Sequence, residues 1–86
     1  MTLASLRIDK LLWHLRQTKS RSLAQALILG GHVRLNGKRV EKSSVEVKAG
    51  DTLTLPKGED AVVIQIVTIP DRRGPAAQMQ ACYIEI

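Results

Sequence analysis

The chain of 86 residues is long enough for one domain with a single core and too short for two. Its 44% hydrophobic and 24% charged residues are ordinary for a folded protein and argue against disorder. Because Trp13 and Tyr83 are the only aromatic residues, the core must be aliphatic, and base stacking on aromatic side chains is excluded as a major binding mode. The net charge of +5 favours a polyanionic partner.

The positive charge is confined to one half of the chain. Residues 1–39 hold eight basic side chains against Asp9 alone, a net charge of +7. Residues 40–86 hold five basic side chains against seven acids, a net charge of −2. We therefore predict that the N-terminal half binds the partner and that the C-terminal half is scaffold.

The sequence predicts a cytoplasmic protein without cofactor or metal. Cys82 is the single cysteine, which excludes an intrachain disulfide and a cysteine-based zinc site. Charged residues interrupt the apolar N-terminus, which makes it a poor signal peptide, and no uncharged run approaches the roughly 18 residues of a membrane span. His14 and His32 have no second ligand at metal-binding spacing, so we expect them at surface or turn positions.

Two short helices are predicted in the basic half. Apolar residues at 8, 11, 12 and 15 form one stripe of an amphipathic helix from about Arg7 to Gln17. Ser20 is a good N-cap for a second helix that runs to about Leu29, where Gly30 and the glycine after it end it.

After the glycines the apolar period changes to two, which predicts strands. The Asn36-Gly37 step is typical of a tight hairpin turn. Further strands are expected over residues 45–47, 52–55, 61–69 and 78–86. The predicted fold is α+β, a single domain over 1–86 in which two N-terminal helices pack on a small, mostly antiparallel sheet.

The predicted hairpin places Arg34 opposite Arg39. Like charges directly opposite each other destabilise a sheet, and a phosphate bound between two guanidinium groups would relieve the repulsion. The alternative is that the two arginine side chains diverge into water.

The start of the second helix adds to the same basic surface. Lys19, Ser20 and Arg21 lie where free backbone N–H groups and the helix dipole favour an anion. Ser22 and Gln25 extend this polar side, so the helix and the hairpin are expected to form one phosphate-binding face. Lys19 by itself would be an ordinary solvated lysine.

Other side chains are expected to support this face. Asp9 can stabilise a helix N-terminus or orient a nearby arginine. Trp13 lies off the main stripe of the first helix and can cap the helix pair or stack on a base, with packing favoured. The segment around Gly37 does not match a nucleotide-binding phosphate loop, because Gly31 is one residue too distant and Arg39 stands where a serine or threonine would hold magnesium. We therefore predict a binding protein and no enzyme.

Residues 7–55 contain the segments RIDK (7–10), LW (12–13), KSRS (19–22), GHV (31–33), NG (36–37) and GD (50–51), together with Arg16, Ala24 and Ile28. In these residues and their spacing the chain resembles the S4 RNA-binding domain family. The resemblance implies the S4-like fold, also called the αL motif, with RNA held by the second helix and the hairpin. The candidate RNA-binding residues are Arg7, Lys10, Arg16, Lys19, Ser20, Arg21, Ser22, Gln25, Arg34, Asn36, Gly37, Lys38 and Arg39.

Within that family the chain is similar to the small ribosome-associated heat-shock proteins of bacteria, which carry a basic C-terminal extension. This similarity implies binding to ribosomal RNA, at a large subunit that holds a stalled nascent chain. Two alternatives remain open: the RNA-targeting module of a pseudouridine synthase or methyltransferase, and a module that binds acidic proteins. We expect a monomer with no small-molecule substrate and no membrane partner.

Overall fold

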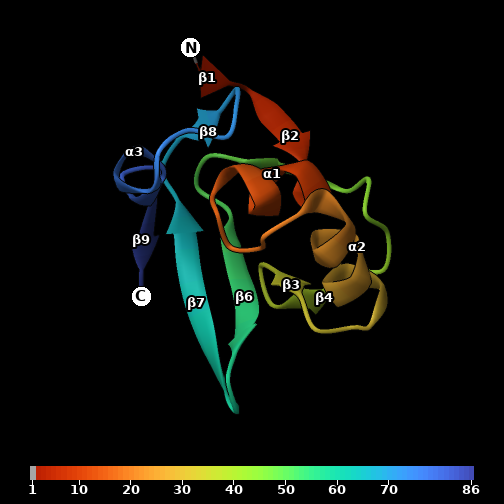
Figure 1. Cartoon of the computed structure of the whole chain (residues 1–86). Helices are drawn as coiled ribbons and strands as arrows, with labels where there is room; N and C mark the ends of the chain where they lie inside the picture. Colours follow the sequence, from red (N-terminus) through yellow and green to blue (C-terminus); the bar gives the residue numbers. More distant parts are fainter. Residues whose placement is uncertain (1) are drawn as a thin grey trace.

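A five-stranded antiparallel sheet forms the centre of the protein (Figure 1). The structure, a computed structural model, describes residues 2–86. In spatial order the strands are β4 (Lys38–Arg39), β3 (Arg34–Leu35), β6 (Thr52–Lys57), β7 (Asp60–Ile66) and β9 (Tyr83–Glu85). Two short antiparallel ladders join β1 (Thr2–Leu3) to β8 (Ile69–Pro70) and β2 (Ser5–Arg7) to β5 (Glu46–Lys48).

The first helix, α1 (Ile8–His14), follows the predicted stripe but is shorter than predicted. All four apolar residues of the stripe are fully buried. The helix ends at His14, with Leu15 as its C-cap, because Arg16 adopts a left-handed conformation with φ of 61°. The N–H of Arg16 bonds to the carbonyl of Trp13 at 3.1 Å and that of Gln17 to Leu12 at 3.0 Å, so the last turn closes as a Schellman motif.

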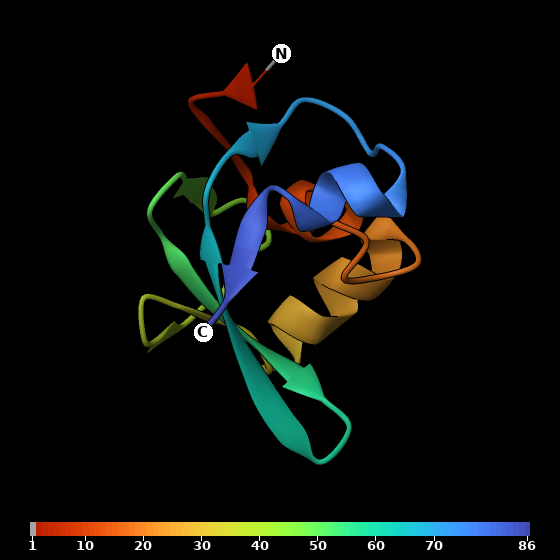
Figure 2. The ribbon, with the colours of Figure 1, turned by 90° about the vertical axis from the view of Figure 1, so that its left-hand side faces the viewer.

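The second helix, α2 (Arg21–Leu29), has the predicted boundaries and caps. The hydroxyl of Ser20 accepts a hydrogen bond from the N–H of Leu23 at 3.1 Å. At the other end Gly31 has φ of +80°, and its N–H and that of His32 close a second Schellman motif. Figure 2 shows α1 and α2 on one side of the sheet formed by β3, β6 and β7.

The core is aliphatic, as the composition predicts. Ala24 and Ile28 of α2 and the stripe of α1 pack against Leu53 of β6 and Ile64 of β7, all of them buried. One prediction about this region was wrong: His14 is only 2% exposed, and its Nδ1 lies 3.2 Å from the carbonyl oxygen of Pro70, which lets the polar ring be buried.

The C-terminal segment also differs from the prediction of a strand over 78–86. A third helix, α3 (Ala76–Gln80), precedes the short strand β9. Alanine, glutamine and methionine favour a helix, and Pro75 directly before it accepts hydrogen bonds from the N–H groups of Gln78 and Met79. The buried Met79 side chain fixes this helix against the core.

The predicted hairpin is confirmed. Arg34 pairs with Arg39 and Leu35 with Lys38, while Asn36 and the glycine that follows have φ values of 50° and 85°. Positive φ at both turn residues is typical of the type I′ turn that an Asn-Gly step favours.

Candidate nucleic-acid interface

A buried carboxylate organises the basic residues near the two helix starts. Asp9 has 0% of its surface exposed and accepts five hydrogen bonds. Its Oδ1 accepts from Nε of Arg7 at 3.2 Å and from the backbone N–H of Lys10 at 2.8 Å. Its Oδ2 accepts from Nη2 of Arg7 at 3.1 Å, Nε of Arg21 at 3.2 Å and Nε2 of Gln25 at 2.9 Å. We call Arg7, Asp9, Arg21 and Gln25 the Asp9 cluster.

The carboxylate of the Asp9 cluster is ionised. Burial opposes its ionisation, but the hydrogen bonds from Gln25, Arg7, the N–H of Lys10 and Arg21 outweigh burial and hold the pKa of Asp9 below its usual value of 3.8. The sequence prediction that this residue orients an arginine is confirmed for two arginines. Because two guanidinium groups surround one carboxylate, the cluster keeps a net positive charge.

The two arginines remain accessible to a ligand. Their side chains are 45% exposed at Arg7 and 41% exposed at Arg21. Lys19 and Ser22, at the start of the same helix, are exposed as well, while the hydroxyl of Ser20 is used by the helix cap. The start of α2 therefore presents cations, as predicted, but Ser20 acts mainly on the helix.

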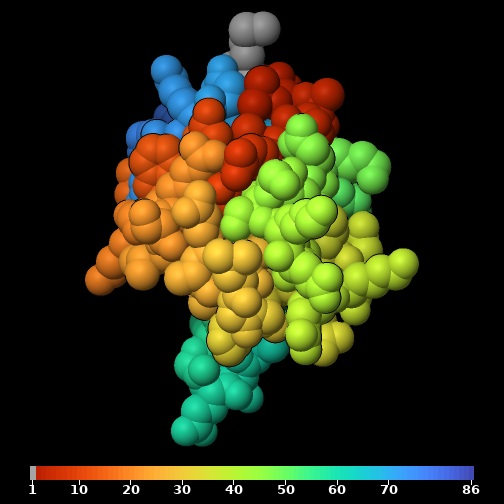
Figure 3. Space-filling view, turned by 90° about the vertical axis from the view of Figure 1, so that its right-hand side faces the viewer, coloured from red at the N-terminus to blue at the C-terminus, as the bar shows by residue number. Residues whose placement is uncertain are grey.

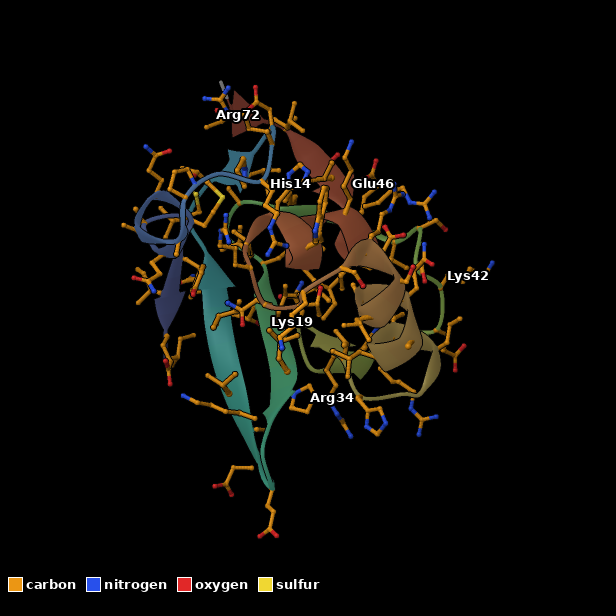
Figure 4. The ribbon with its side chains drawn as sticks, viewed as in Figure 1. His14, Lys19, Arg34, Lys42, Glu46 and Arg72 are labelled. Carbon is orange, nitrogen blue, oxygen red and sulfur yellow. The ribbon has the colours of Figure 1, made fainter. Side chains whose placement is uncertain are left out.

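The hairpin arginines lie opposite each other, yet their side chains diverge. Nη1 of Arg34 lies 3.4 Å from the carbonyl oxygen of Gly37, and Figure 4 shows Arg34 at the lower end of the body. The Arg39 side chain covers Gly31, where a β-carbon would lie 3.4 Å from its Nε. The geometry therefore favours the diverging alternative for the unbound protein, and an anion bound between the two remains a prediction.

Asn36 serves the fold through its side chain. Its Nδ2 donates to Oδ1 of Asp51 at 3.1 Å, and its Oδ1 accepts from the N–H of Thr52 at 2.9 Å. Burial opposes ionisation of Asp51, but bonds from the N–H of Lys48, from Asn36 and from the Lys48 ammonium group keep its pKa below 3.8. The hairpin is thus fixed to β6, and Lys38 with Gly37 stays exposed at its tip.

Arg16 contacts a different part of the molecule. Its Nε donates to the carbonyl of Gly74 at 2.7 Å. In return, Nη1 of Arg73 donates to the carbonyls of Trp13 at 2.6 Å and Thr18 at 3.1 Å, and its guanidinium carbon lies 5.4 Å from the centre of the Trp13 ring. Trp13 is half-buried, and its ring contacts the Arg73 guanidinium and the ring of His14; whether it stacks on a base stays untested.

Figure 3 shows how these elements combine on one face of the molecule. The start of α1, helix α2 and the segment 36–46 lie side by side there. A hollow of about 340 Å³ is lined by Leu35, Lys38, Arg39, Val40, Glu41, Lys42 and Val45. Lys42, which Figure 4 shows extending away from the body, was missed because it belongs to the net-negative half of the sequence.

Two kinds of feature are absent from residues 2–86. In this range no three or more His, Cys, Asp or Glu side chains form a group that could hold a metal ion. Within the same residues no helix has the length and apolarity needed to cross a membrane.

Several known proteins resemble this chain in sequence and fold. The S4 domain profile matches residues 6–53. Heat shock protein 15 of Escherichia coli (strain K12) is 39% identical over 79 residues, which cover 92% of this chain and 59% of that protein. The homologue of Haemophilus influenzae is 38% identical over the same share of this chain. The small ribosomal subunit protein uS4 of Trichlorobacter lovleyi is 40% identical over 55 residues, 26% of its length.

A solved structure gives the same fold. Heat shock protein 15 of Vibrio cholerae, described as trimeric, superposes with a TM-score of 0.89 at 41% identity, covering 95% of this chain and 82% of that one. The chain spans about 59% of the length of the Escherichia coli relative. Because the profile matches more than half of the chain and the solved relative is matched over most of its length, the chain belongs to the S4 domain family, on the branch that includes heat shock protein 15.

Proposed function

We propose that the protein binds folded RNA without catalysing a reaction. The RNA binds the face formed by α2, the start of α1 and the β3–β4 hairpin, which we call the basic face. The observation that carries this proposal is the convergence of Arg7, Arg21 and Gln25 on Asp9 beside a basic hairpin. Fixed guanidinium groups match phosphate oxygens. With few aromatic side chains, recognition rests on the shape and phosphates of a folded RNA.

We further propose that this RNA is ribosomal. Relatives of this chain are named as a ribosomal protein and as heat shock proteins. The family resemblance implies the large subunit with a stalled nascent chain, and a ribosomal partner agrees with the expected cytoplasmic location. Sedimentation with purified large and small subunits tests this assignment. Comigration with the large subunit is expected, and comigration with the small subunit alone would contradict it.

Salt dependence tests whether phosphate contacts dominate. The logarithm of the affinity for a folded ribosomal RNA fragment should fall linearly with the logarithm of salt concentration, because bound lysines and arginines release counterions. Fluorescence anisotropy between low and physiological salt measures the slope. An affinity that stays constant over this range would refute RNA binding through the basic face.

Substitutions test where the RNA binds. Arg39→Thr and Arg21→Ala should each lower affinity about tenfold or more, since each removes a charge-assisted contact with phosphate. Arg39→Thr should leave the unbound protein about as stable, because the Arg39 side chain is exposed and diverges from Arg34. Lys57→Ala, at the exposed end of β6, is the control and should bind like the parent. Loss of binding in the control alone would place the RNA elsewhere.

A further inference from the structure

We infer that Asp9, an acid, strengthens the binding of a polyanion because it positions Arg21 for one phosphate group. This inference rests on the proposed RNA binding. Simple charge counting gives the opposite expectation, since an aspartate beside the RNA should repel it. The two expectations give opposite signs for the change in RNA affinity when the charge of Asp9 is removed, so a binding measurement distinguishes them.

The geometry at Arg21 supports this role. Arg21 bonds to Asp9 through Nε alone. Its two terminal nitrogens take part in none of the hydrogen bonds formed within residues 2–86. Those nitrogens form the outer edge of a guanidinium that is anchored on its inner side. Because this side chain is already held in place, its guanidinium offers two parallel donors to phosphate and loses little conformational entropy on binding.

Gln25 and Arg7 complete the anchor. Both donate to Oδ2 of Asp9 alongside Arg21, at 2.9 Å and 3.1 Å, so the carboxylate receives donors from β2 and from two turns of α2. With no exposed surface, Asp9 cannot meet the RNA itself. It therefore acts through Arg21 as a positioning residue.

Asp9→Asn tests the inference because it keeps the size of the side chain. Its amide NH₂ must face two or three of the donors that now meet an oxygen, so part of the cluster is displaced. We expect RNA affinity to fall about tenfold, although the net charge rises by one unit. Glu85→Gln is the control, because it adds the same charge on β9, at the other end of the sheet from the hairpin, and should bind equally or slightly more tightly.

Arg21→Lys provides a second variant that does not depend on the stability of the first. It keeps the charge, but one ammonium group cannot hold Asp9 and grip phosphate bidentately, so affinity should fall. Arg72→Lys, at the end of the molecule far from α2 in Figure 4, is the matched control and should bind like the parent. In a double-mutant cycle, Arg21→Ala should cost less in the Asp9→Asn background, with a coupling of about twofold or more.

The outcomes separate this inference from the proposed function. A parent protein that shows no salt-dependent RNA binding overturns both. A parent that binds, together with an Arg21→Lys variant of equal affinity, overturns the positioning role alone. So does a folded Asp9→Asn variant that binds as tightly as the parent or more tightly. Thermal melts of each variant establish that it is folded at the temperature of the binding measurement.

Discussion

His14 is the residue through which pH should act on the stability of this fold. Burial lowers the pKa of its imidazole below the usual 6.5; the Pro70 carbonyl and Asp71 oppose this effect, while Lys10 and Arg21 reinforce it. The folded state therefore favours the neutral ring, which can donate from Nδ1 to the carbonyl.

We predict that the free energy of unfolding decreases as pH falls below about 6.5, because the unfolded chain then binds a proton that the folded chain resists. The decrease should stop once pH is below the folded pKa. His14→Asn keeps a donor near Nδ1 and should give a flat profile between pH 5 and pH 7, where Asp9 and Asp51 stay ionised. Urea titrations over this range measure both profiles, and an equal slope in the variant would contradict the assignment.

At the scale of single elements, the start of α2 depends on one side chain. Ser20→Ala removes the acceptor for the N–H of Leu23 and should lower stability by about 1 kcal/mol. Ser22→Ala, two residues later on the exposed side, is the matched control and should change stability by less than about 0.5 kcal/mol. Thermal unfolding followed by circular dichroism compares the two, and equal losses would show that the cap is unimportant.

The end of α1 combines strain with a tertiary bond. Arg16 occupies the left-handed position where glycine is usual, a conformation that costs about 1 kcal/mol for other residues. Arg16→Gly loses the bond to Gly74 but also the strain, so it should be nearly neutral. Arg16→Ala loses the bond and keeps the strain, and should be less stable than Arg16→Gly by about 1 kcal/mol. Chemical denaturation measures the difference, and a more stable alanine variant would contradict this account.

At the scale of the whole molecule, the family motif is smaller than the folding unit. The S4 profile ends at residue 53, but β7 pairs with β6 along its length, and Ile64, Ile66 and Ile69 lie in the core. We predict that a chain ending at residue 57 does not fold, whereas a chain lacking only Ile86, which is 74% exposed, does. Cooperative thermal unfolding of the chain that ends at residue 57 would disprove the prediction. The oligomeric state is a separate question: light scattering of the full chain tests the expected monomer.

Local signals in the sequence predicted both main helices, the two caps of α2 and the hairpin, because these features depend on residues within a few positions of one another; the end of α1 at Arg16 was not predicted. The remaining features depend on distant partners. His14 is buried through a carbonyl 56 residues later, and Asp9 gathers donors 12 and 16 residues away. Helix α3 was missed because its alternation of apolar residues also suits a strand, and the packing of Met79 decided between them.

The hairpin that joins β6 to β7 has a consequence for the path of the RNA. Its end carries Gly58, Glu59 and Asp60, all exposed, and Figure 3 shows this end projecting beyond the lower border of the basic face. With exposed Lys57 opposite Asp60, this end carries a net charge of −1, which repels phosphates weakly. We expect the footprint of a bound nucleic acid to cover the start of α1, helix α2 and the segment 36–46, to stop short of this projection, and to leave its end in water.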